Sequence, residues 1–261
     1  MFDKTRRLFL MALTCAGAAC VGGQAYASGM PELQESLFWG DEVERGDLPP
    51  VAERVPQSPL IVDLEAKGRE QGKVGGVLRT MVSRSKDVRQ MVVYGYARLV
   101  GYDENYELQP DLLESYASEE NRKFTLKLRP GHRWSDGHPF TSEDFRFWWE
   151  DVANNPLLSP AGPPDFLRVE GQMPRVEFPD EHTIVYEWDA PNPNFLQKLA
   201  QARPPFIYRP SHYLKKFHEK FATPEELKVE IRNARVRSWA ALHNKLDNMY
   251  KNDNHLLPTL Q

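Results

Sequence analysis

Apolar residues change their spacing from two to about 3.6 within one short segment, residues 124–152. The first six residues alternate between apolar and polar side chains, which predicts a half-buried strand that ends at Pro130–Gly131. Further on, apolar residues recur at i, i+3, i+4 and i+7, which predicts a helix with one buried face, formed by Phe145, Trp148, Trp149 and Val152. Asn154–Asn155–Pro156 predicts the end of that helix.

The link between the predicted strand and helix carries turn and capping residues. Ser135–Asp136–Gly137 predicts a turn, because aspartate bonds nearby backbone and glycine tolerates positive φ. Thr141 is a predicted helix N-cap with Asp144 at the third helical position, and Phe140 is placed to pack against Phe145 as a hydrophobic staple. The start of the helix is therefore strongly specified.

Weaker patterns predict the remaining elements. Two β-rich runs, 175–178 and 183–188, are separated by turn residues and predict a hairpin. Thr223–Pro224–Glu225–Glu226 predicts a second capping box with proline at the first helical position. Similar reasoning predicts a helix at 195–202, a helix from Trp239 to Met249, a buried element at 112–116 and a short strand at 60–64.

Composition is that of a folded globular chain, with 41% hydrophobic and 27% charged residues. The 21 prolines favour a loop-rich mixed α/β (α+β) fold over a helical bundle. The formal charge is −4, and residues 1–27 contribute +2 of it (three basic residues against Asp3), which leaves −6 on the rest. This negative charge argues against a nucleic-acid partner.

Residues 1–27 have the features of an export signal. Residues 5–10, TRRLFL, match the twin-arginine pattern, and the apolar run at 8–19 is too short to span a bilayer. Ala25–Tyr26–Ala27 is a small-x-small cleavage site, so we expect cleavage after Ala27 and a periplasmic protein. Two alternatives stay open: the arginines serve the general secretion route, or Cys20 is lipidated.

Candidate catalytic and metal-binding groups have simpler structural explanations. Both cysteines, Cys15 and Cys20, lie in the predicted signal, so the mature chain has no disulfide, thiolate metal site or cysteine nucleophile. His132, Asp136 and His138 are spaced like metal ligands, but they lie on a turn-rich loop without a fourth ligand nearby.

Candidate acid/base and ring-stacking residues also have structural explanations. Asp136, Glu143 and Asp144 could form paired carboxylates, but turn and cap roles already explain Asp136 and Asp144. Trp148 and Trp149 could stack on sugar or peptide rings, but their helical spacing favours core packing. Phosphate-loop, serine-elbow and HExxH motifs are absent, so the sequence predicts no catalytic residue, no metal site and no cofactor.

The segment LRPGHRWSDGHPFTSEDFRFWWEDV resembles the signature of the family 5 extracellular solute-binding proteins, the peptide-binding branch of ABC importers. In that family a strand ending in LR-x-G leads into W-S-D-G-x-P-x-T-x-E-D and an aromatic helix. Other segments are similar in the same order: GGVLRTMV at 75–82 to the first strand, 91–100 to a helix before the turn 103–105, and FIYRPSHYLKKFHEKF to a later segment. The resemblance covers nearly everything from Gly72 onward.

The resemblance implies a mixed α/β fold, a periplasmic-binding-protein-like type II lobe that is incomplete. Family members are longer and continue into a second lobe where this chain ends. The implied organisation is an export signal at 1–27, an N-terminal arm at 28–71 and an N-terminal lobe at 72–261.

The implied function is the periplasmic substrate-binding component of an ABC importer, without enzymatic activity. The loop after the first strand lies at the cleft in this family, so the implied ligand-binding residues are Ser83, Arg84 and Ser85. The implied partners are a peptide or small-molecule solute and an ABC permease at the inner membrane, with the protein a monomer. The solute stays open among peptides, oligosaccharides, opines and metal chelates. Two alternatives also stay open: an exported lobe that does not bind solute, and an exported hydrolase that uses Asp136 and Glu143.

Overall fold

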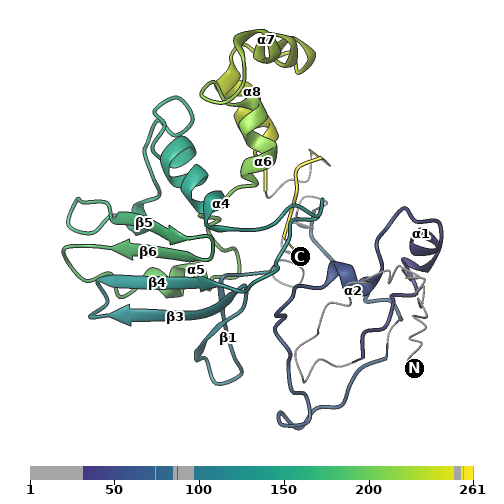
Figure 1. The fold of residues 1–261 in the computed structure, drawn as a ribbon. Helices are drawn as coiled ribbons and strands as arrows, with labels where there is room; N and C mark the ends of the chain where they lie inside the picture. The colour runs from purple at the N-terminus through teal and green to yellow at the C-terminus, as the bar shows by residue number, and fades with distance from the viewer. Residues whose placement is uncertain are drawn as a thin grey trace, which may run out of the picture. The chain divides into compact units, whose positions relative to one another are not determined.

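A four-stranded antiparallel sheet, in the order β3-β4-β6-β5, is the main β-structure of this computed structural model (Figure 1). The structure describes residues 32–73, 75–84, 87, 97–249, 254 and 256–260. The strands are β3 (Leu113–Glu119), β4 (Lys123–Leu128), β5 (Arg175–Asp180) and β6 (Thr183–Glu187). The strand predicted at 124–129 and the hairpin predicted at 175–188 are therefore present, and the mixed α/β fold class is confirmed.

Apolar and polar residues alternate along β4, and the apolar ones form part of one buried face of this sheet. Phe124 lies opposite Tyr186 and Leu126 opposite Ile184, and all four side chains are buried. Phe195 of α5 (Phe195–Leu199) packs on the same face, with its ring 5.0 Å from that of Phe124. The opposite face carries polar residues such as Lys127, so the sheet is covered on one side by the core and is polar on the other.

A small two-stranded sheet precedes the large one. β1 (Val100–Tyr102) pairs antiparallel with β2 (Leu108–Pro110). Between them Asp103 Oδ1 accepts hydrogen bonds from the amides of Asn105 and Glu107, each at 2.9 Å. The turn expected at 103–105 is confirmed, and the aspartate side chain is what closes it.

The helices are short apart from α7 (Pro224–Asn233) and α8 (Trp239–Leu246). The capping box of α7 is confirmed, since Thr223 Oγ1 accepts from Glu226 N at 3.3 Å and Glu226 Oε2 accepts from Thr223 N at 2.9 Å. The predicted helix at 195–202 is confirmed only as the five-residue α5, and the last predicted helix ends at Leu246, before Met249. The remaining helices are α1 (Gly40–Glu44), α2 (Val51–Arg54), α4 (Ser142–Phe147), the π-helix Trp148–Ala153, the 3-10 turns Asp165–Leu167 and Lys215–Phe217, and α6 (Ser211–Leu214).

The link between β4 and α4, residues 129–141, is called the signature loop below. The helix that follows it changes geometry half-way along. α4 ends at Phe147, and a π-helix continues to Ala153. Phe145, Trp148 and Val152 are buried as predicted, but Trp149 is only half-buried and Asp151 is buried instead. The wider π-helical turn is tolerated where tertiary contacts offset its poorer backbone geometry. Here the Asp151 carbonyl lies 3.0 Å from His218 Nε2, 67 residues further along the chain.

Three expected elements differ in the structure. Residues 60–64 and 75–82 form no strand, because an extended segment becomes a strand only by pairing with a neighbour, and neither segment pairs within the described residues. Most of their apolar side chains are exposed, up to 98% at Met81. The expected helix at 91–100 falls mostly outside the described residues, and its last residue, Val100, begins strand β1 instead.

Within the described residues, no helix has both the length and the apolar composition needed to cross a membrane.

Candidate functional site: the signature loop and its polar network

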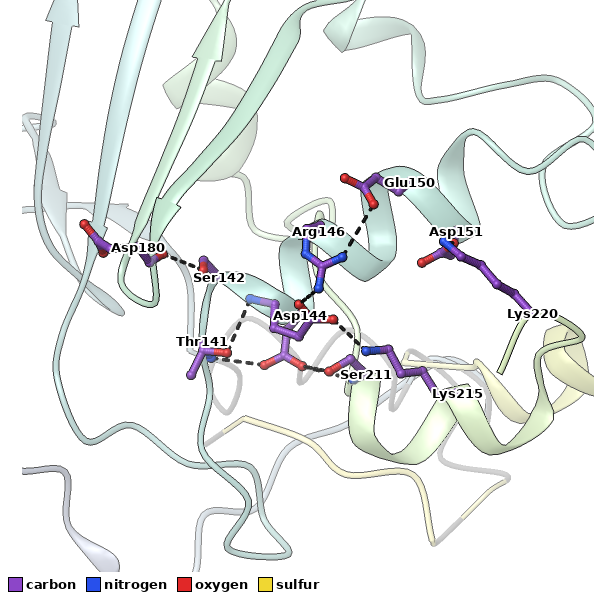
Figure 2. A network of polar contacts seen from close by, with 11 residues as sticks. Thr141, Ser142, Asp144, Arg146, Glu150, Asp151, Asp180, Ser211, Lys215 and Lys220 are labelled. Carbon is purple, nitrogen blue, oxygen red and sulfur yellow. Dashed lines mark hydrogen bonds and ion pairs between the residues drawn. The ribbon is translucent and has the colours of Figure 1, made fainter. Parts of the chain in front are cut away.

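The carboxylate of Asp144 is the centre of a buried hydrogen-bond network at the start of α4 (Figure 2). Asp144 is 1% exposed. Its Oδ1 accepts from Ser211 N at 3.0 Å and from Ser211 Oγ at 2.8 Å. Its Oδ2 accepts from Trp134 Nε1 at 3.0 Å and from Thr141 N at 3.1 Å. One side chain therefore joins the signature loop, the start of α4 and the start of α6.

The predicted cap and staple are both confirmed. Thr141 Oγ1 accepts from Glu143 N at 3.3 Å, and the rings of Phe140 and Phe145 lie 5.6 Å apart. Ser142 ties the same helix start to the β5–β6 turn, because its Oγ donates to the Asp180 carbonyl at 2.6 Å. The helix start is thus fixed to both the loop before it and the sheet beneath it.

Electrostatics at Asp144 fit a structural role. Burial raises the pKa of this carboxyl, and the donors from Ser211, Trp134 and Thr141 oppose the rise by favouring the charged form. Four donors bind the two oxygens, and among the described residues no cationic side chain pairs with this carboxyl.

The three candidate acid/base carboxylates have separate partners. Glu143 pairs with Arg146 and with Lys215 Nζ, the latter at 2.6 Å. Asp144 is enclosed in its own network, with Thr141 and Ser211 (Figure 2). This arrangement supports the turn and cap explanation over paired acid/base chemistry.

Asp136 and His138 meet a residue that the sequence did not single out. His212 Nε2 donates to Asp136 Oδ2 at 2.7 Å, and the His138 and His212 rings stack with centroids 3.9 Å apart and 2° between their planes. Partial burial acts to raise the pKa of Asp136, but hydrogen bonds from His212 and from the His138 amide outweigh it and lower that pKa. His212 is 76 residues away in the chain, so no local pattern could have revealed it.

The candidate metal ligands do not form a metal centre in this geometry. The structure brings Asp136 and His138 together with His212, but His132 is not part of that contact. In the part of the chain that the structure describes, no group of three histidine, cysteine, aspartate or glutamate side chains could hold a metal ion.

The signature loop also holds the end of the described chain. Ser135 N donates to the Thr259 carbonyl at 2.9 Å, and Ser135 Oγ accepts from Thr259 N at 3.1 Å. Leu257 and Leu260, on either side, are buried in the core. The loop therefore positions residues 256–260 through one backbone–backbone hydrogen bond and one bond to the Ser135 hydroxyl.

Trp148 is a core residue by geometry. It is 4% exposed and belongs to the main hydrophobic cluster, with its ring 6.2 Å from that of Trp149. Trp149 packs against the same cluster with part of its ring exposed. This supports core packing over ring stacking for Trp148.

Only part of the predicted ligand-binding loop is described. Ser83 is exposed, and Arg84 donates from its amide and guanidinium to the Asp87 carboxylate, at 3.1 Å for the amide. Ser85 lies outside the described residues. The assignment of Ser83, Arg84 and Ser85 to a ligand stays a prediction.

Comparison with known proteins supports the family suggested by the signature loop. Residues 107–231 match the model of the bacterial extracellular solute-binding proteins, family 5 Middle. A solved structure described as oligopeptide-binding protein OppA superposes with a TM-score of 0.74 at 31% identity, covering 88% of this chain and 35% of that one. The resemblance to family 5 is confirmed.

Family 5 relatives differ in the solute that their descriptions give. The periplasmic alpha-galactoside-binding protein of Rhizobium meliloti (strain 1021) is 30% identical over 203 residues, 69% of this chain and 28% of that protein. The periplasmic oligopeptide-binding protein OppA of Escherichia coli (strain K12) is 26% identical over 174 residues, 61% of this chain and 30% of that protein. The Agrobacterium fabrum protein MelB, solved with stachyose, shares the fold at a TM-score of 0.55 and 23% identity, covering 88% of this chain and 35% of that one.

The chain spans about a third or less of the length of these family 5 proteins. All of them are described as binding proteins. The fold is thus that of part of a periplasmic-binding-protein-like molecule.

Proposed function

We propose that this chain is part of the periplasmic substrate-binding component of an ABC importer, and that it is not an enzyme. The observation that carries the proposal is the signature loop, which matches family 5 and is held in place by the buried Asp144 network. The separate partners of Asp136, Glu143 and Asp144 count against the hydrolase alternative. The inner-membrane permease is the proposed partner, and the protein acts as a monomer.

The proposed organisation is an export signal at 1–27, an arm at 28–71 and one lobe of a two-lobed receptor at 72–261. Support comes from the span of a third or less of the relatives' length and from the exposed, unpaired apolar residues of the segment 75–82. Neighbouring exposed apolar side chains are typical of a surface that another part of a protein covers. Ser83, Arg84 and Ser85, which follow this segment, are the proposed contribution of the lobe to the solute site.

The proposed solute is a peptide or a similar small molecule, and the relatives suggest two chemistries to test. One relative is named for oligopeptides and another for alpha-galactosides. Deletion of the coding region should abolish or strongly reduce uptake of either a radiolabelled tripeptide or a radiolabelled α-galactoside trisaccharide, and restoration of the gene should recover it. Unchanged uptake of both solute classes would contradict the proposal.

Export is expected to follow the twin-arginine route, with the mature protein beginning at Ser28. Replacement of Arg6 and Arg7 by lysine keeps the positive charge but removes the pair that this route recognises, so periplasmic yield should fall to near background. N-terminal sequencing identifies the first residue of the mature protein, and cell fractionation measures the periplasmic yield. Unchanged yield of the double variant would indicate the general secretion route, and a lipid on Cys20 would contradict cleavage after Ala27.

A further inference from the structure

Two buried histidines lie where the C-terminal helices meet the π-helix. His218 follows the 3-10 turn Lys215–Phe217 and is 2% exposed, while His243 on α8 is 0% exposed. Their rings are 5.9 Å apart and nearly perpendicular, at 83°. Phe147 of α4 contacts both rings, at 6.1 Å and 6.2 Å between centroids. The pair thus forms part of the packing between α8 and the helix that carries the signature.

The hydrogen bonds of His218 require the neutral ring. Its Nδ1 accepts from Lys220 N at 3.1 Å, and its Nε2 lies 3.0 Å from the Asp151 carbonyl, to which it must donate. A second proton would occupy Nδ1 and break the bond from Lys220. Trp239 of α8 packs against this ring, with the two ring centroids 4.7 Å apart, so His218 is part of the contact that holds α8.

His243 has no hydrogen-bond partner for either ring nitrogen within the described residues. A charged imidazolium at this position would hold two buried N–H donors without acceptors, which is strongly unfavourable.

The charged groups around the two rings are already paired with one another. Asp247 and Arg209 face His243 and bond each other at 2.6 Å, while Asp151 faces His218 and bonds Lys220 Nζ at 2.6 Å. Glu219 is the remaining charged group that acts on His218. Asp247 and Asp151 thus each have a cation before either histidine is protonated.

Burial lowers the pKa of His243 from 6.5 to about 4, and burial also lowers the pKa of His218. A histidine released into water regains a pKa near 6.5 and binds a proton more readily than the docked one. The docked state therefore keeps its full stability above pH 6.5 and loses it as the pH falls toward 4.

We propose that His218 and His243 form an acid-sensitive latch, which holds α8 against Phe147 of α4 and the π-helix at neutral pH and releases it in mild acid. This latch is a property of the chain's own packing and stands whether or not the protein binds a solute. Neutral rings complete the apolar contact, and protonation of either ring places a charge in it.

Amide hydrogen exchange of the 261-residue chain, corrected for intrinsic rates, tests the latch. Between pH 6.5 and 4 the opening equilibrium of α8 amides should rise by about 80-fold, the ratio that follows from a pKa of 6.5 in the released state and about 4 in the docked state of His243. Amides of β4 and β6 should respond far less. Equal rises in α8 and in the sheet, or no rise in α8, would overturn the proposal.

Two variants distinguish release of α8 by His218 and His243 from destabilisation of the whole chain at low pH. His243→Leu replaces the titrating ring by an apolar side chain of similar size. The pH response of α8 should then fall to the smaller contribution of His218. His132→Gln removes another partly buried histidine, outside the latch, and should leave the response of α8 unchanged. An α8 response that disappears in His132→Gln but persists in His243→Leu would overturn the proposal.

A direct measurement covers the case in which His243→Leu does not fold. The imidazole C–H resonances of the wild-type chain, followed by NMR against pH, should show one histidine titrating near pH 4. If all histidines titrate near 6.5, the rings are not held neutral and the latch does not exist.

Discussion

This chain alone is expected to bind peptides and oligosaccharides with a Kd of about 1 mM or weaker, near 4 kcal/mol of binding free energy. A solute in a two-lobed receptor is buried from both sides, and roughly 70–90% of the surface of a small ligand is covered in a well-formed pocket. The chain spans 35% or less of its relatives, so in our proposal it supplies one wall of the site. Loss of the opposite wall removes contact area and admits water.

Isothermal titration calorimetry with trialanine and with stachyose measures this expectation. A full-length family 5 relative, titrated with its own solute under the same conditions, is the positive control. A one-to-one complex with micromolar Kd would show that the chain is a complete binding module, and the proposal that it supplies only one wall of the site would be wrong. The exposed apolar segment 75–82 should also make the chain self-associate at high concentration, which sedimentation velocity measures.

Trp148→Ala is expected to lower the free energy of unfolding by about 3–5 kcal/mol. The ring is 4% exposed and lies in the main core, so its removal leaves a cavity that the surrounding side chains fill only in part. Trp149→Ala is the matched control, because the same residue type on the next position is only half-buried. Thr141→Ala, which removes one cap acceptor, should cost about 1 kcal/mol.

Urea denaturation of the three variants gives the order directly, from midpoints at constant slope. We expect Trp148→Ala to be the most destabilised, with Trp149→Ala and Thr141→Ala closer to the wild type. If Trp148→Ala left the midpoint unchanged while the equivalent change in a full-length relative weakened solute binding, the tryptophan would belong to the solute site. The core assignment would then fail.

Local patterns were sufficient for elements whose causes lie within a few residues. The alternation at 124–129 predicts β4, and Thr141 with Asp144 predicts the start of α4, because a cap bonds amides only two or three residues away. Thr223 specifies the start of α7 in the same way. The signature segment also identified the family, which the match at 107–231 confirmed.

Sequence patterns failed where an element depends on distant partners. The segment 75–82 has the composition of a strand, but pairing requires a neighbour that the described chain does not provide. The periodicity after Trp148 fits a regular helix, yet contacts from His218 and Lys220 accompany a π-helix there. The spacing of apolar residues along the chain predicts neither the unpaired segment nor the π-helix.

The sequence by itself determined the strands with alternating residues, the capped helix starts and the family, because each depends on short-range bonds or on a dense motif. Only the tertiary structure brought His212 to Asp136, Ser211 to Asp144, Thr259 to Ser135 and His243 to His218. These contacts join residues 25 to 124 positions apart. Such contacts form only when the packed core holds distant segments together, so no local pattern encodes them.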